Sequence, residues 1–117
     1  MKKSTATRLT VSDQPQDAMT RDRAARAAAM LRALGNPTRL MVLCSLIEGE
    51  RSVGALNERI PLSQSALSQH LAKLREEDLV ATRRESQTIY YRVADPMVYE
   101  LIETLYGRYC AREEGGE

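Results

Sequence analysis

The spacing of apolar residues in this 117-residue chain changes from a helical period to a strand-like period and back again. Residues 63–77 place leucines three and four positions apart, as one face of a helix requires. Two short β-like runs follow, Leu79–Arg83 and Thr88–Val93, and the second alternates apolar side chains. From Pro96 the helical spacing returns. The pattern predicts one β-hairpin in an otherwise helical chain.

Capping signals divide the helical part into segments. Four residues that favour the N-cap position stand immediately before predicted helices: Asn36, Ser52, Ser63 and Asp95. The predicted helices are Asp17–Leu34, Pro37–Glu48, Val53–Arg59, Ser63–Glu77 and a last one from Pro96. Arg84–Gln87 forms the expected hairpin tip. The predicted fold class is mainly α with a small β-hairpin, in the order α-α-α-α-β-β-α.

The length is that of one domain. We predict a domain over residues 16–112, with a disordered arm over residues 1–15 and a disordered tail over residues 113–117, because both ends lack apolar periodicity. No stretch approaches the roughly 18 consecutive apolar residues of a membrane span, and the basic start lacks the apolar run of a signal peptide. We therefore expect a cytoplasmic protein without membrane association.

The helix predicted over residues 63–77 has an unusual outer face. Its leucines lie within about 40° of one another around the helix axis: Leu67, Leu71 and Leu74. The opposite side carries small, uncharged residues: Ser65, Ser68, Gln69 and Ala72. A solubilising face normally carries Glu and Lys, whereas Ser and Gln provide short hydrogen-bond donors and acceptors that protrude little from the helix. Such a surface suits a helix that lies in the major groove of DNA.

Two arginines, Arg83 and Arg84, lie near the tip of the predicted hairpin. A short helix, a tight turn, a polar-faced helix and a hairpin in this order are typical of a winged helix-turn-helix, whose hairpin arginines contact phosphates or the minor groove. The alternative is a small helical domain whose hairpin covers the core and whose tip carries a solvated charge pair. The first interpretation predicts double-stranded DNA as the partner.

The net charge of +1 conceals an uneven distribution. Residues 1–62 carry ten Lys and Arg against six Asp and Glu, whereas residues 95–117 carry two against six. The acidic excess therefore belongs to the last helix and the tail, away from the helix proposed to read DNA. The near-zero total does not exclude a nucleic-acid partner.

Three separated segments resemble the ArsR/SmtB family of dimeric bacterial repressors: Ala33–Leu40, Leu62–Arg75 and Gln87–Tyr91. The resemblance covers residues 20–112, and it implies a homodimer that pairs through its first and last helices and binds operator DNA. It also implies these DNA-facing positions: Ser63, Gln64, Ser65, Ser68, Gln69 and His70. His70 has an alternative place at the edge of the core, with its ring hydrogen-bonded.

Metal-sensing members of this family bind ions at two usual places, and this chain lacks the ligands of both. Ser52–Leu56 has no cysteine where the family's cysteine motif stands, and the last helix offers Glu100 and Glu103 without a histidine. The single histidine of the chain also excludes sites that need two or three imidazoles from one chain. We therefore expect no metal site and no cofactor.

Two cysteines, Cys44 and Cys110, remain as candidate sensor residues. Cys44 shares a helical face with three apolar residues, which predicts a place on the core side: Leu40, Leu43 and Ile47. Spacing alone favours inert, buried cysteines. The pair, however, resembles that of the sulfide- and persulfide-responsive (BigR/SqrR-type) members of the family. This resemblance implies a dithiol switch that reacts with persulfide or oxidant and then releases operator DNA.

Three alternatives stay open. The same thiols could sense As(III), Cd(II) or a peroxide, although two thiols per protomer are few for soft metals. A small thiol-redox enzyme is disfavoured because the chain has no CxxC motif and no βαβ pattern, and we expect no catalytic residues. The third alternative is a helical module that dimerises without binding DNA. It would lack the DNA binding, weakened by salt, that a repressor shows.

Overall fold

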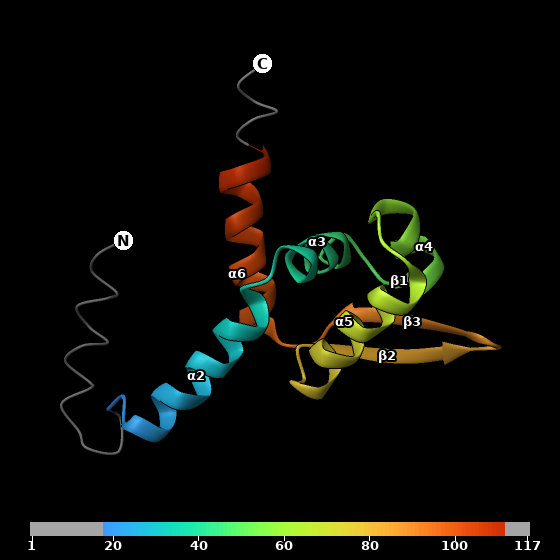
Figure 1. The fold of residues 1–117 in the computed structure, drawn as a ribbon. Helices are drawn as coiled ribbons and strands as arrows, with labels where there is room; N and C mark the ends of the chain where they lie inside the picture. Colours follow the sequence, from blue (N-terminus) through green and yellow to red (C-terminus); the bar gives the residue numbers. More distant parts are fainter. Residues whose placement is uncertain (1–17, 112–117) are drawn as a thin grey trace. The chain divides into compact units, whose positions relative to one another are not determined.

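The structure is a computed structural model that describes residues 18–111 (Figure 1). The predicted arm and tail lie outside the described residues. The chain divides into two compact units, one up to Arg32 and one from Ala33 onward. The described residues form five α-helices, a three-stranded antiparallel sheet and a π-helical turn, which confirms the predicted fold class. None of the helices within residues 18–111 is both long and apolar enough to span a bilayer.

Helix α2, Arg21–Leu34, begins later than the predicted start at Asp17. Thr20 determines the start, because its Oγ1 accepts the N–H of Arg23 at 3.2 Å and its carbonyl accepts the N–H of Ala24 at 2.8 Å. A side-chain acceptor at this position satisfies an N–H group of the first turn. The predicted start is wrong because this threonine cap, and not the helix propensity of the preceding residues, fixes the first turn.

The other helices begin at the four caps expected from the sequence. They are α3, α4, α5 and α6, with the bounds Pro37–Leu46, Val53–Arg59, Gln64–Glu76 and Pro96–Tyr106. In each case the side chain of the cap accepts a backbone N–H of the first turn: Asn36, Ser52, Ser63 and Asp95. After α6 the chain continues as the π-helical turn Gly107–Ala111.

The sheet has the strand order β1-β3-β2. Its strands are β1, β2 and β3, with the bounds Arg51–Ser52, Val80–Glu85 and Thr88–Val93. The hairpin of β2 and β3 was predicted, but its tip is only Ser86 and Gln87. Strand β1 was not predicted, because two residues have no period to detect. By pairing with β3, it joins the residues before α4 to the hairpin.

Helix α3 packs against α4, α5, α6 and β3. Its buried side chains are Val42, Leu43, Ser45 and Leu46. Cys44 is only half-buried, as are its predicted face-mates Leu40 and Ile47. The prediction that Cys44 lies on the core side is therefore wrong. The buried face of α3 is centred between Val42 and Leu46, and at about 100° per residue Cys44 lies on the opposite side of the helix.

Two other helices supply much of the remaining core. The three leucines predicted for the inner face of α5 are all 0% exposed: Leu67, Leu71 and Leu74. Helix α6 buries Val98 and Ile102, whereas other apolar side chains on it and on the π-helical turn are exposed: Met97, Leu105 and Tyr109. The inner face of α5 was thus predicted correctly, and α6 has an apolar surface on both sides.

Helix α5 ends in a Schellman motif. The N–H of Asp78 donates to the carbonyl of Arg75 at 3.0 Å, and the N–H of Leu79 donates to the carbonyl of Leu74 at 2.9 Å. Asp78 adopts the left-handed conformation, with φ 62°. The motif satisfies the last carbonyl groups of the helix, and both leucines are buried. A residue with a Cβ atom therefore holds a conformation that glycine adopts more easily.

Replacing Asp78 by glycine is expected to stabilise the protein by about 0.5–1 kcal/mol. The left-handed conformation costs a residue with a Cβ about 1–2 kcal/mol, and the greater freedom of glycine in the unfolded chain offsets about 0.4–1 kcal/mol of the gain. The midpoint of urea unfolding should rise for Asp78→Gly. Glu76→Gly, inside the same helix, should lower it. A midpoint for Asp78→Gly at or below that of the wild type would contradict the expectation.

Candidate functional site

Helix α5 presents a polar surface opposite its buried leucines. Ser63 accepts the N–H of Ala66 at 3.1 Å, and its Oγ lies 3.4 Å from the Oγ of Ser65. Five of the six predicted DNA-facing residues are exposed, and we call them the reading face: Ser63, Gln64, Ser65, Ser68 and Gln69. Residues 63–69 contain no charged side chain, so this surface offers only short hydrogen-bond donors and acceptors.

His70, the sixth predicted residue, is half-buried. Its Nδ1 accepts a hydrogen bond from Nε of Arg39 at 3.2 Å, and Arg39 also donates through Nη1 to the carbonyl of Ala33 at 3.5 Å. A neutral imidazole that accepts at Nδ1 carries its proton on Nε2. The ring therefore lies at the edge of the core, bonded to α3 through one nitrogen, with the other nitrogen as a donor.

Arg83 and Arg84 lie on opposite faces of the hairpin, because successive side chains of a strand point to opposite sides. Nε of Arg83 lies 2.8 Å from Oε1 of Glu50, and its Nη1 lies 3.1 Å from Oε1 of Glu85. Its guanidinium also lies over the ring of Tyr90, 4.7 Å from the centroid. Among the described residues, Arg84 has no ion-pair partner. The structure therefore does not bring the two arginines together, and the charge of Arg83 is balanced by Glu50 and Glu85.

A groove of about 410 Å³ lies between α5 and β3. The residues that line it define the α5–β3 groove: Ser68, Ala72, Arg75, Glu76 and Tyr91. Of these, only Ser68 was predicted as a site residue. Arg75 and Tyr91 were missed because their proximity depends on how the hairpin packs beside the helix, which no local pattern of the sequence reports.

Cys44 of α3 and Cys110 of the π-helical turn line one cavity of about 240 Å³. The rest of this thiol cavity is formed by apolar and aromatic residues: Leu40, Met41, Leu105, Tyr106 and Tyr109. Both cysteines are free thiols and both are half-buried. Residues 18–111 contain no group of three or more His, Cys, Asp or Glu side chains that could hold a metal ion. The predicted pair is thus brought together as two thiols in an apolar setting.

The surroundings of Cys44 disfavour its thiolate. Burial raises the pKa of the Cys44 thiol above its ordinary value, and the negative charges of Cys110 and Glu48 raise it further. At neutral pH Cys44 is therefore held in the thiol form, whereas the thiolate is the nucleophile.

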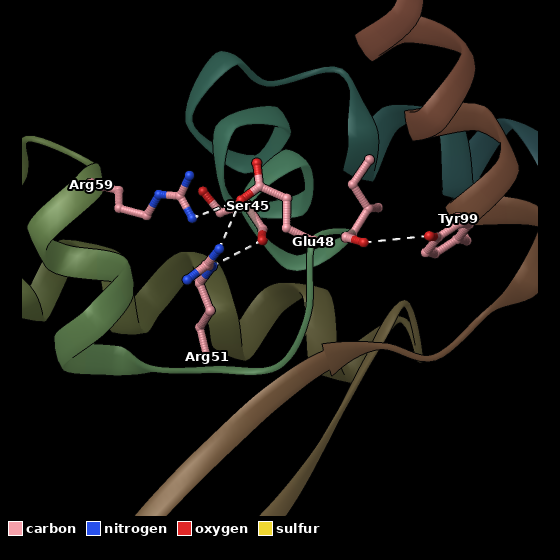
Figure 2. Close-up of polar contacts among 6 residues, drawn as sticks. Ser45, Glu48, Arg51, Arg59 and Tyr99 are labelled. Carbon is pink, nitrogen blue, oxygen red and sulfur yellow. Dashed lines mark hydrogen bonds and ion pairs between the residues drawn. The ribbon is translucent and has the colours of Figure 1, made fainter.

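Polar contacts join the C-terminal end of α3 to three neighbouring elements (Figure 2). Oε1 of Glu48 accepts from Arg51 of β1 at 2.8 Å and from Arg59 of α4 at 3.0 Å. The hydrogen bond from Arg59, with that from Arg51, lowers the pKa of the Glu48 carboxyl below its ordinary value. The hydroxyl of Tyr99 on α6 donates to the carbonyl of Ile47 at 3.4 Å. A displacement of α3 relative to α6 would therefore also change the contact between Glu48 and Arg59 of α4.

The chain matches a described protein family and a curated repressor. Residues 36–82 match the family described as "Bacterial regulatory protein, arsR family". The chain is 44% identical over 106 residues to the biofilm growth-associated repressor of Agrobacterium fabrum, a match that covers 91% of this chain and 90% of that relative. At this identity and coverage the similarity extends well beyond the matched family segment.

Two solved structures have a similar fold. Reduced HlyU from Vibrio cholerae superposes with a TM-score of 0.73 at 48% identity, covering 76% of this chain and 94% of that one. The transcriptional repressor BigR from Xylella fastidiosa superposes with a TM-score of 0.70 at 43% identity, covering 79% and 91%. The chain therefore belongs to the arsR family of bacterial regulatory proteins, and it is a winged helix-turn-helix transcriptional regulator rather than an enzyme.

Proposed function

We propose that this regulator is a homodimeric repressor that binds operator DNA through α5 and releases it when a persulfide or another oxidant links Cys44 to Cys110. The observation that carries this proposal is the thiol cavity, which both cysteines line. Repression is supported by the name of the Agrobacterium fabrum relative, and redox sensitivity is supported by the description of the Vibrio cholerae structure as a reduced form.

In the proposed complex, the reading face of α5 lies in the major groove and contacts base edges. His70 joins it through Nε2–H, at the border of the reading face. Arg84 reaches the phosphates or the minor groove from the hairpin, and Arg83 can do so only when its ion pairs with Glu50 and Glu85 open. Two copies of α5 in successive major grooves require half-sites centred about 10 bp apart, or a multiple of that spacing.

Exposed apolar side chains support pairing through the first and last helices. Leu31 of α2 is 57% exposed, and on α6 and the turn after it Met97 is 48% and Tyr109 is 67% exposed. A monomer would leave these surfaces in water, whereas contacts between two copies would bury them. We therefore assign α2 and α6 to the interface of the proposed homodimer.

The proposed switch is a two-electron oxidation of the thiol pair. The thiolate of Cys110 attacks the outer sulfur of a persulfide RSSH, which forms a persulfide on Cys110 and releases RSH after protonation. The thiolate of Cys44 then attacks Sγ of Cys110, the inner sulfur of this persulfide, which forms the Cys44–Cys110 disulfide and expels HS⁻, released as H₂S after protonation. The two thiols lose two hydrogen atoms in total, and the incoming persulfide is reduced to RSH and H₂S.

The raised pKa of Cys44 makes Cys110 the attacking thiol, and this order can be tested by alkylation. At pH 7 iodoacetamide is expected to modify Cys110 first, and the rate at Cys44 should keep increasing at pH values above the ordinary thiol pKa of about 8.5. Peptide mass spectrometry over a pH series measures both rates. In Cys110→Ser one cause of the shift is absent, so the profile of Cys44 should move to lower pH. A wild-type Cys44 with the profile of an exposed thiol would contradict the assignment.

A link between the cysteines would reach the reading face through contacts already described. It would change the position of α3 relative to α6, and Glu48 bonds the end of α3 to α4, which packs on α5. Since α6 belongs to the proposed interface, the same displacement would alter the relation between the two reading faces of the dimer. An allosteric coupling of about 1–3 kcal/mol corresponds to DNA binding weakened about 5- to 150-fold.

The proposal is tested with a fluorescent duplex that the reduced protein itself selects from random-sequence DNA. Anisotropy should show binding that weakens with salt, and persulfide treatment should release the duplex while the intact protein loses two hydrogen atoms or gains bridging sulfur. Release accompanied by one added oxygen, or by bound arsenic or cadmium, would favour the peroxide or metal sensor instead. A reduced protein without salt-dependent DNA binding would overturn the repressor proposal.

A further inference from the structure

The α5–β3 groove lies where a winged helix-turn-helix must accommodate one strand of DNA. In a duplex, a sugar-phosphate backbone separates the major groove from the adjacent minor groove. If α5 occupies the major groove and the hairpin lies over the next minor groove, that backbone passes between them. The groove between α5 and β3, about 410 Å³ in volume, is the space available to it.

We propose that the α5–β3 groove is a phosphate seat in which Arg75, Tyr91 and Ser68 hold one phosphate of the operator backbone. This inference rests on the proposed function. Arg75 supplies the positive charge, and the hydroxyl groups of Tyr91 and Ser68 supply hydrogen-bond donors. Ala72, also in the lining, has a side chain too short to obstruct the approach of a backbone. The remaining lining residue, Glu76, is an exposed carboxylate that repels a phosphate, so the attraction of Arg75 and the two hydroxyl groups must exceed this repulsion.

The charges around the hairpin favour Arg75 over Arg83 for this contact. Arg83 is engaged with Glu50 and Glu85, on the sheet face opposite Tyr91. Arg75 is exposed and, among the described residues, has no ion-pair partner. A guanidinium without a carboxylate partner releases counterions from DNA when it binds a phosphate, whereas an ion-paired one must first break its own bonds.

The sheet register adds a neighbour to the seat. Thr82 pairs with Tyr91, and Arg84 lies two residues further along the same strand, so that all three side chains share one face of the sheet. Arg84 is therefore on the sheet face of the seat, nearer the hairpin tip. One backbone strand could contact Arg75 and Tyr91 at the seat and Arg84 at a following phosphate.

The seat is tested by the salt dependence of DNA binding in Arg75→Gln. Because the proposed dimer has one seat in each protomer, the substitution removes two phosphate contacts. Binding to the selected duplex and to an unrelated duplex should weaken by the same factor, about 25- to 100-fold near 0.1 M salt, and the slope of log K against log salt should decrease in magnitude by about 1.8. Tyr91→Phe should weaken both by about 5- to 100-fold, with the slope unchanged. The thermal unfolding midpoint of each variant shows that it is folded.

Arg108→Gln is the matched control, since it removes the same charge from an exposed residue of the π-helical turn that does not line the α5–β3 groove. Its slope should equal that of the wild type. If Arg75→Gln changes the slope no more than Arg108→Gln does, or weakens the selected duplex alone, the phosphate seat is refuted while the repressor proposal stands. Absence of salt-dependent binding by the wild type would instead refute the repressor proposal.

Discussion

The Cys44→Ser and Cys110→Ser variants are expected to stay on operator DNA after a persulfide treatment that releases the wild-type protein. Each variant keeps one thiol, which can still accept a sulfur atom, but no bond can form between α3 and the π-helical turn. Without that bond, oxidation of the remaining thiol cannot supply the coupling free energy of about 1–3 kcal/mol that weakens DNA binding. In anisotropy titrations, the wild type should therefore lose about 5- to 150-fold in affinity and each variant less than about twofold.

Met41→Leu is the matched control for these two variants. Met41 lines the same thiol cavity but has no thiol, and the exchange conserves side-chain volume. This variant should release DNA as the wild type does. If either serine variant also releases DNA to the extent of the wild type, oxidation acts at another place and the dithiol switch is disproved.

The largest effect on stability is expected from Leu71→Ala, which should lower the free energy of unfolding by about 2–5 kcal/mol. Leu71 is 0% exposed on the inner face of α5, which packs against α3, α4 and β2. Its truncation removes apolar contacts and leaves a cavity that the surrounding helices only partly close. In a domain of this size the thermal midpoint should fall by at least about 8 °C, as measured by circular dichroism.

Gln69→Ala on the exposed side of the same helix separates stability from DNA recognition. An exposed substitution should change the free energy of unfolding by no more than about 0.5 kcal/mol. If Gln69 contacts a base, however, its loss should weaken operator binding by about 1–3 kcal/mol for each half-site and reduce discrimination at that base pair. Equal destabilisation by the two substitutions, or unchanged operator affinity in Gln69→Ala, would show that the two faces of α5 are assigned incorrectly.

The parts of the fold that could be predicted from sequence depend on interactions within a few residues. Asn36, Ser52, Ser63 and Asp95 each accept a backbone N–H two or three positions further along, so the sequence alone contains the whole signal for those helix starts. The inner face of α5 was also predicted, because three leucines at helical spacing leave one orientation that buries them all.

The parts that could not be predicted depend on contacts between distant segments. Cys44 was expected on the core side, but α3 is surrounded by several elements, and their arrangement decides which of its sides is buried. The sequence does not distinguish Arg83 from Arg84, whereas the sheet register and the position of Glu50 give them different surroundings. The α5–β3 groove likewise exists only after the hairpin packs beside the helix.

Strand β1 has a consequence for building chimeric regulators. It hydrogen-bonds to the middle of the hairpin, and Arg51 within it also donates to the carbonyl of Ser45 at 3.0 Å. A transplant of α5 and the hairpin alone would cut this sheet and leave an unpaired edge on β3. The smallest cassette that could be moved between relatives to change operator preference is therefore residues 51–93, grafted as one piece.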